Sequence, residues 1–156
     1  MRLVLVLVNL LSQRQEIEET VDRLGLLIDA KEWLELGEIL AETVELDYVS
    51  LFGGQIEHLL RAEVIDRWKA QLSPLKATQH VITNQHIAIQ TDNTATCACN
   101  VVATHVRPNP LGDSLWTVGG RYDFRLAHEG GRWRISAIQL TVLWTTGNPQ
   151  VLSPSG

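Results

Sequence analysis

The sequence predicts a single α+β domain in which about three N-terminal helices and a curved antiparallel sheet close around an apolar pocket. Three observations support this fold class. Apolar residues recur at helical spacing in much of the first half of the chain, whereas four long segments after Ser73-Pro74 alternate like strands. The chain has 156 residues, of which 45% are hydrophobic, so it can bury one core but is short for two domains.

The first expected element is an amphipathic helix from Gln13 to about Lys31, with Ser12 as its N-cap. Charged residues lie beside and between its apolar positions, namely Glu16, Glu18, Glu19, Asp22 and Arg23. The apolar residues that define its buried face are Ile17, Val21, Leu24 and Ile28. This face is expected to pack against the sheet.

Shorter elements follow this helix. A second helix is expected over residues 31–40, and a third helical pattern covers residues 59–72. Between them, residues 43–50 alternate like a strand, and Gly53-Gly54 marks a turn.

The second half of the chain is expected to form the sheet. Its four candidate strands cover residues 78–90, 94–107, 114–128 and 132–145. Turn-like residues separate them, including the segments 91–93, 108–113 and 129–131. Gly119-Gly120 lies within the third of these strands and indicates a bulge or bend that curves the sheet.

The ends of the chain are expected to lie outside the domain, which is placed at residues 13–146, with an extension over 1–12 and a tail over 147–156. Arg2 and the apolar run after it resemble a short signal-peptide core, but the run is too short to span a bilayer and no small-x-small site follows. We therefore expect an extra docking segment or extension, and a cytoplasmic protein.

Composition argues against several classes of partner and cofactor. The formal net charge is -5 and the pI is near 5.5, with scattered basic residues, so nucleic acid is not an expected partner. The sequence has no glycine-rich phosphate loop and no zinc-type spacing. Cys97 and Cys99 share a strand face and are expected to be reduced, small apolar residues, although a C-x-C pair could hold a metal with outside ligands.

The strand over residues 94–107 points to a pocket with an inward histidine. Its odd positions are small or apolar and end in His105, and small residues leave volume that a solid core would fill. The alternation of the preceding strand does not define its inner face, because a bulge near Asn84 would switch the parity. In an antiparallel pair joined at residues 91–93, the paired residue numbers sum to about 184, which places His80 close to Thr104 and His105.

Asp29 is the candidate partner of His80. It stands near the C-terminal end of the first helix, where the macrodipole disfavours a carboxylate, so its presence there requires a reason. A carboxylate that accepts a hydrogen bond from one imidazole nitrogen fixes the tautomer and stabilises the charged ring. The other nitrogen can then act as a base.

Four short segments carry a family resemblance: Ile28-Asp29-Ala30, Leu46-Asp47-Tyr48, Thr78-Gln79-His80 with Asn84, and Thr104-His105. Their order and spacing over residues 13–145 resemble the SnoaL-like branch of the nuclear transport factor 2-like superfamily, and within it the scytalone dehydratase-like proteins most closely. The resemblance implies a cone-shaped half-barrel with helices across its mouth and a hydrophobic substrate. It implies no metal and no organic cofactor.

The same resemblance implies roles for individual residues. His80 is the general base, and Asp29 orients it and balances its charge. His105 hydrogen-bonds substrate or water, and Tyr48 polarises a substrate carbonyl, directly or through water. Asn84 at most contacts these residues and does not touch the substrate.

Two positions depart from the family pattern. Scytalone dehydratase-like sites have a second tyrosine immediately before the aspartate, where this chain has Ile28. Some relatives that eliminate other leaving groups have an arginine on the last strand, where this chain has Ile138. The substrate of the family therefore does not transfer to this chain.

The expected function is a cofactor-independent lyase or isomerase, dehydratase-like, acting on a hydrophobic cyclic carbonyl compound such as a polyketide- or steroid-like molecule. Aldol-type polyketide cyclisation begins with the same proton abstraction, so a polyketide cyclase is an alternative function. A non-catalytic small-molecule-binding or dimerisation domain is the third alternative. The expected partners are the small-molecule substrate and a second copy of the chain in a homodimer or higher homo-oligomer, with no membrane.

Overall fold

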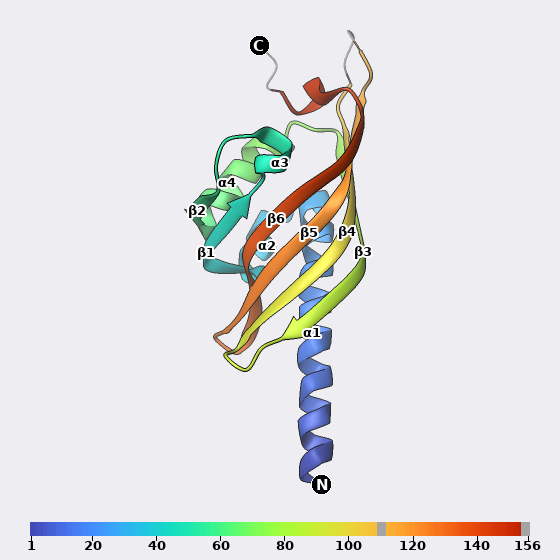
Figure 1. Ribbon diagram of the computed structural model, residues 1–156. Helices are drawn as coiled ribbons and strands as arrows, with labels where there is room; N and C mark the ends of the chain where they lie inside the picture. Colours follow the sequence, from blue (N-terminus) through green and yellow to red (C-terminus); the bar gives the residue numbers. More distant parts are fainter. Residues whose placement is uncertain (109–111, 154–156) are drawn as a thin grey trace.

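The computed structural model describes residues 1–108 and 112–153, so the expected 108–113 connection and the C-terminal tail lie partly outside the described residues. Strands and helices form an open, curved α+β fold (Figure 1). The helices are α1 (Arg2–Ala30), α2 (Trp33–Ile39), α3 (Val49–Phe52) and α4 (Arg61–Leu72), with a short 3-10 helix η1 (Pro149–Leu152). The strands are β1 (Leu40–Asp47), β2 (Glu57–Leu60), β3 (Ala77–Ile89), β4 (Thr94–Val106), β5 (Leu115–Glu129) and β6 (Arg132–Gly147).

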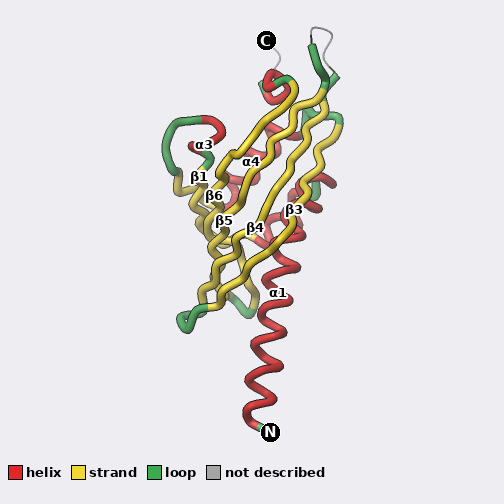
Figure 2. Tube along the Cα trace, turned by 45° about the vertical axis from the view of Figure 1, so that its right-hand side comes forward, coloured by secondary structure: helices red, strands yellow, loops and turns green. Residues whose placement is uncertain are grey.

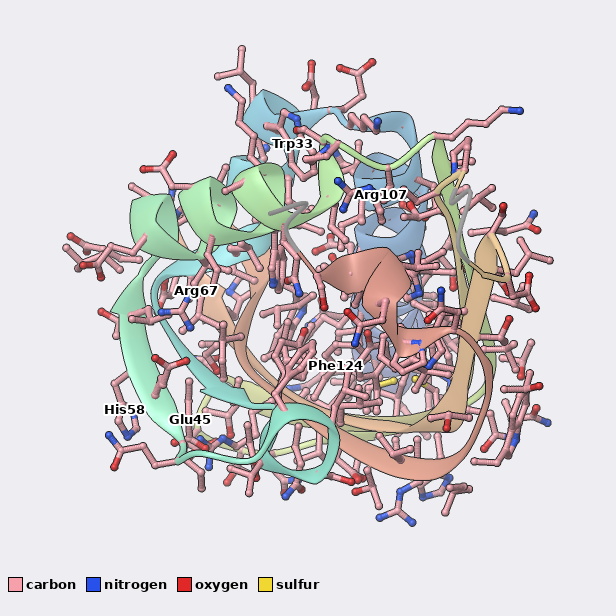
Figure 3. All side chains as sticks on the ribbon, turned by 90° about the horizontal axis from the view of Figure 1, so that it is seen from above. Trp33, Glu45, His58, Arg67, Arg107 and Phe124 are labelled. Atoms are coloured by element: carbon pink, nitrogen blue, oxygen red, sulfur yellow. The ribbon has the colours of Figure 1, made fainter. Side chains whose placement is uncertain are left out.

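The six strands form one sheet in the order β2-β1-β6-β5-β4-β3. The strands β3 to β6 are an antiparallel meander, while β1 runs parallel to β6, with Leu46 opposite Ile138. Seen from above, the sheet curves round the interior, and α1 and α4 lie across its open side (Figure 3). This confirms the predicted α+β class and the half-barrel.

The first helix differs from its prediction at its N-terminal end. Helix α1 begins at Arg2, so a start at Gln13 and a cap at Ser12 are wrong. Residues 3–11 contain no glycine or proline and are rich in leucine, so nothing stops the helix from extending towards the N-terminus. The predicted face, from Ile17 to Ile28, is buried as expected.

The N-terminal part of α1 projects away from the rest of the protein (Figures 1 and 2). Its leucines and valines are exposed, from 45% for Leu10 to 72% for Leu3. Among the described residues, no helix is both long and apolar enough to cross a membrane.

The helical pattern predicted over residues 59–72 contains two elements. Leu59 and Leu60 belong to the short edge strand β2, where Leu60 pairs with Thr43 of β1. Helix α4 then begins at Arg61, and the Glu63 side chain accepts the backbone N–H of Leu60 at 2.8 Å. A carboxylate three residues after Leu60 therefore marks the helix start better than the apolar spacing does.

Two irregularities bend the sheet. The pairing of β5 with β6 shifts between Gly119 and Gly120, which confirms the predicted bulge. A Cβ at Gly119 would overlap the Trp144 ring, so a side chain is excluded there. The pairing of β3 with β4 shifts between Thr83 and His86, and Asn84 has a positive φ of 59°.

The core lies between the helices and the concave face of the sheet. On β4, the predicted inner face is buried: Cys97, Cys99, Val101, Ala103 and His105. Both cysteines are free thiols, as expected. The small residues on this strand leave room next to His105, where the candidate site lies.

Candidate active site

Asp29 and His80 are joined where the end of α1 meets the beginning of β3. His80 Nδ1 lies 2.7 Å from Asp29 Oδ1, and the His80 backbone N–H donates to Asp29 Oδ2 at 2.8 Å. The Thr78 hydroxyl also donates to Oδ1, at 2.9 Å. Three hydrogen bonds therefore hold this carboxylate, and two of them come from His80.

The charge of Asp29 fixes the tautomer of the neutral His80 ring. Burial raises the pKa of Asp29, but the hydrogen bonds from the ring and backbone of His80 and from Thr78 outweigh it and hold this pKa below its ordinary value. An ionised carboxylate only accepts hydrogen bonds, so His80 Nδ1 carries a proton. The lone pair of the neutral ring is then on Nε2, on the side away from Asp29.

Local packing explains why α1 comes so close to β3. An added Cβ at Gly25, one helical turn before Asp29, would lie 3.2 Å from His80 Cβ and 3.3 Å from the His80 carbonyl oxygen. Lys31 secures the helix end, because its Nζ donates to the carbonyls of Leu75 at 2.8 Å and Ser73 at 3.0 Å. The helix end and the strand start are thus held at hydrogen-bonding distance.

His105 lies beside His80 on the neighbouring strand β4. The two rings are 6.0 Å apart and nearly perpendicular, and His105 also packs at 5.6 Å on the ring of Trp116. His105 Nδ1 donates to the Trp116 carbonyl at 3.3 Å. Burial and the neighbouring His80 lower the pKa of His105 to about 4, so this ring is neutral at neutral pH.

The strand pairing that suggested this neighbourhood is correct to within one residue. His80 pairs with Ala103 and Thr78 pairs with His105, so the numbers sum to 183 on this side of the bulge. Beyond the bulge the sum is 184, as for His86 and Ala98. The bulge near Asn84 accounts for the difference, because it adds one residue to β3.

His80 and His105 line a cavity of about 70 Å³ with mostly apolar walls. A larger outer chamber of about 700 Å³ lies next to this cavity. Both spaces share five lining residues, Tyr48, Phe52, Trp68, Gln71 and Leu152. Arg67 and Arg107, labelled in Figure 3, line only the outer chamber.

The four predicted site residues lie close together, but only three of them line the cavity. His80, His105 and Tyr48 line the cavity, whereas Asp29 lies behind His80 with its side chain 20% exposed. Asn84 does not support the site: it is exposed at the β3 bulge, where its Oδ1 accepts from Asn100 Nδ2 at 3.3 Å. The bulge switches the parity of β3, as the sequence left open: the less exposed residues are even-numbered up to Ile82 and odd-numbered from Gln85 onwards.

The two departures from the family pattern have different surroundings. Ile28 lines the cavity, so an apolar side chain occupies the wall where the resemblance has a tyrosine. Ile138 is buried on β6, while the β6 residue that lines the cavity is Leu140.

Tyr122 is a cavity residue that sequence reasoning missed. It lies on the concave face of β5, is 6% exposed and lines the cavity together with Tyr48. Burial and the interaction with Tyr122 raise the pKa of Tyr48 well above its ordinary value. The alternation of Val118, Gly120, Tyr122 and Phe124 could have indicated it, because a tyrosine on an apolar strand face needs a polar partner.

No arrangement in the described part of the chain resembles a metal site, since no group of three or more His, Cys, Asp or Glu side chains could hold an ion. Trp133 Nε1 is a buried donor without a hydrogen-bond partner among the described residues, and it lies outside the cavity.

The curved sheet, the helices across it and the polar groups in an apolar cavity define a cone-shaped fold of the nuclear transport factor 2-like class. The chain belongs to the SnoaL-like domain family, whose profile matches residues 9–139. A comparison with curated protein sequences gives no match.

Solved structures agree with this fold. The Kfla4162 protein from Kribbella flavida is 26% identical, with 92% of this chain and 98% of that chain covered and a TM-score of 0.86. A Novosphingobium aromaticivorans protein assigned provisionally as a scytalone dehydratase is 20% identical, with coverages of 88% and 89% and a TM-score of 0.74. A type 2 hexachlorocyclohexane dehydrochlorinase, LinA, is 15% identical, with coverages of 90% and 92% and a TM-score of 0.76.

Proposed function

We propose that this protein is a cofactor-independent lyase or isomerase in which His80 removes a proton next to a carbonyl group of a hydrophobic cyclic compound. One observation carries the proposal. Asp29 binds His80 through both the ring and the backbone, at 2.7 and 2.8 Å, so the remaining ring nitrogen is free on the cavity side. A fixed, charge-balanced imidazole in an apolar cavity is suited to general acid–base chemistry.

In the proposed reaction, a single proton moves from the substrate to His80 and is then returned to the substrate or to its leaving group. His80 Nε2 takes the α-proton, the C–H electrons form the enolate, and the ionised Asp29 stabilises the imidazolium. A tyrosine hydroxyl, or a water held by His105, donates to the enolate oxygen. In a dehydration, the imidazolium then gives its proton to the leaving hydroxyl, which departs as water; in an isomerisation, it returns the proton to another carbon.

The neutral state of His105 favours this scheme. A second positive charge 6.0 Å from His80 would oppose formation of its imidazolium, and the pKa of about 4 keeps His105 uncharged at neutral pH. Because Nδ1 of the neutral ring donates to the Trp116 carbonyl, His105 Nε2 can accept a hydrogen bond, for example from water, without competing for the proton.

The names of two structurally similar proteins support a lyase. A dehydratase removes water and a dehydrochlorinase removes hydrogen chloride, and both names belong to proteins of this fold. Each elimination takes a proton from the substrate, which is the step that Asp29 and His80 are arranged to assist. The substrate class is inferred from the apolar cavity walls and the roomy outer chamber.

The test is proton exchange between solvent and ketones. The protein is incubated in deuterium oxide with a panel of bicyclic and steroid ketones, beginning with β-tetralone, and loss of the α-proton signals is followed by NMR. We expect catalysed exchange with at least one member and a roughly 10²- to 10⁴-fold lower rate for His80→Ala.

His86→Ala is the matched control, since His86 lies on the same strand but is exposed. This variant should exchange at the wild-type rate. Binding of ketones without any α-proton exchange would contradict the proposed enzymatic activity and favour a binding domain. Product analysis of a ketone that does react would distinguish elimination from aldol cyclisation.

A further inference from the structure

The inner cavity and the outer chamber meet at the residues that line both of them. We call these the boundary residues: Tyr48, Phe52, Trp68, Gln71 and Leu152. Gln71 is the only side-chain amide among them. Its helix, α4, lies across the open side of the sheet (Figure 3). Gln71 is thus placed to contact a ligand that occupies both spaces.

The Gln71 amide is a polar group on the inward face of α4. Trp68, Gln71 and Leu72 are spaced as i, i+3 and i+4, and all three line the inner cavity. Trp68 and Leu72 are buried, as expected for the apolar face of an amphipathic helix. Gln71 is half-buried, and its side-chain amide has no hydrogen-bond partner among the described residues. A leucine or methionine would fill this wall without a polar group, so packing alone does not explain an amide here.

The inner cavity is too small to enclose a whole ring. An apolar cavity that binds benzene in another protein measures about 150 Å³, whereas the inner cavity here measures about 70 Å³. A cyclic substrate can place its reacting edge next to His80, but its remaining atoms extend past the boundary residues into the outer chamber of about 700 Å³. The part of the ring system beyond the reacting edge therefore lies beside Gln71.

We propose that Gln71 is a specificity-determining residue that hydrogen-bonds a second oxygen of the substrate, carried by the ring next to the one that reacts at His80. A glutamine side chain offers two N–H donors and a carbonyl acceptor, so it pairs with a hydroxyl or a carbonyl group. The inference rests on the proposed function and deepens it, because it names the substrate class. That class is a polycyclic ketone with a further hydroxyl or carbonyl group.

A substrate that lacks the second oxygen is selected against at this position. It replaces the water around the Gln71 amide with hydrocarbon, so the amide loses hydrogen bonds and gains none. The net loss of one uncharged hydrogen bond corresponds to roughly tenfold in affinity or in kcat/KM.

The test compares β-tetralones that carry one substituent on the aromatic ring, at each free position in turn. A hydroxyl group supplies the second oxygen, and a methyl group of similar size does not. Exchange of the α-protons in deuterium oxide gives kcat/KM for each compound. At one position or more, the wild-type protein should favour the hydroxyl compound over its methyl counterpart by roughly tenfold.

Substitution of Gln71 tests whether the amide causes this preference. Gln71→Met keeps an unbranched side chain of similar length and should lower the hydroxyl-to-methyl ratio roughly tenfold. The ratio is taken within each variant, so a general loss of activity and the intrinsic reactivity of the compounds cancel. Gln71→Leu repeats the comparison with a second apolar side chain. Gln55→Met should keep the wild-type ratio, because Gln55 is an exposed glutamine that lines only the outer chamber.

A binding measurement gives a second readout that does not depend on turnover. Proton–nitrogen NMR detects the side-chain amides, and loss of a signal pair in Gln71→Met assigns Gln71. The favoured hydroxytetralone should shift this pair more than the methyl compound does. The dissociation constants of the two compounds should differ roughly tenfold for the wild-type protein and by less for Gln71→Met.

A hydroxyl-to-methyl ratio that is the same in the wild type and in both Gln71 variants would overturn the proposal. Ketone exchange that depends on His80, with a ratio that does not depend on Gln71, would remove this inference and leave the proposed function standing. Selective binding of a hydroxytetralone through Gln71, without any exchange, would leave the Gln71 site standing and remove the proposed reaction.

Discussion

The carboxylate of Asp29 holds His80 at two points, the ring Nδ1 at 2.7 Å and the backbone N–H at 2.8 Å. The backbone contact fixes the position of the strand relative to the helix, and the ring contact fixes the tautomer. A single side chain thus determines both where the candidate base lies and which nitrogen faces the cavity.

Asp29→Asn should lower ketone exchange by roughly 10²- to 10⁴-fold while the fold is retained. The asparagine amide can donate to His80 Nδ1, which moves the ring proton to Nε2 and removes the lone pair from the cavity side. Nitrogen NMR of labelled histidine reports the tautomer change directly. Asp22→Asn is the control on the same helix, where the carboxylate accepts from Gln85 on the exposed surface; it should leave both the rate and the tautomer unchanged.

Gly25→Ala should lower the exchange rate without altering any group that takes part in the chemistry. The added methyl would lie 3.2 Å from His80 Cβ, so α1 and β3 must separate and the Asp29 contacts lengthen. Small displacements of a catalytic group cost up to about 10²-fold in rate.

Gly37→Ala provides the comparison, since its added methyl would meet only flexible side-chain atoms, Ile65 Cδ1 at 3.4 Å and Arg61 Cδ at 3.7 Å. Measured rates and melting temperatures of the two variants separate the effects. An exchange rate for Gly25→Ala equal to that of Gly37→Ala would show that the close approach of helix and strand does not matter.

The free energy of unfolding should decrease as the pH falls from about 6.5 to about 4. His105 has its folded-state pKa lowered, so in this window the unfolded chain binds a proton that the folded protein does not, and stability is lost towards acid. The contribution is at most on the order of 3 kcal/mol. The pKa of Asp29 is lowered from 3.8, so its contribution is present above that pH and is lost only at more acidic values.

Urea denaturation at a series of pH values measures this slope. His105→Gln should flatten it between pH 4 and 6.5, whatever its effect on stability at neutral pH. His86→Gln should keep the wild-type slope, because His86 is exposed. An unchanged slope in His105→Gln would mean that His105 is not the buried neutral group.

Removal of residues 1–11 should change the free energy of unfolding by no more than about 0.5 kcal/mol, because their side chains are largely exposed. Removal of residues 1–17 also deletes Ile17, which is fully buried, and should cost about 2 kcal/mol or more. Chemical denaturation of the two truncated chains tests the predicted domain start near residue 13. A large loss in the shorter truncation would show that the exposed helix contributes to folding.

Alternation made the sheet predictable, because burial of one face imposes a period of two on long strands. The ends of β3 and β4 lie within one residue of their predicted limits. The start of α1 was not predictable in the same way: residues 3–11 have helix-forming side chains but no core to pack on, so their periodicity carries no information. The four residues of β2 are too few to show a period against the apolar spacing of α4.

The candidate site could be assembled from sequence only where strand pairing or resemblance connected distant residues. Register brought His80 near His105, the position of a carboxylate at a helix end pointed to Asp29, and the resemblance added Tyr48. The hydrogen bond from the His80 backbone to Asp29 depends on the approach of α1 to β3, which a small residue such as Gly25 permits but no local pattern encodes. Tyr122 was missed because the cavity that it lines with Tyr48 is formed by elements far apart in the sequence.

The most direct test of the central claim compares wild-type protein with His80→Gln in α-proton exchange of one ketone that the wild type accepts. Glutamine keeps a polar side chain at this position but cannot act as a base near neutral pH. The rate of His80→Gln should be at least about 10²-fold lower, with the circular dichroism spectrum and melting temperature close to those of the wild type. Exchange at the wild-type rate in the folded variant would contradict the assignment of His80 as the base.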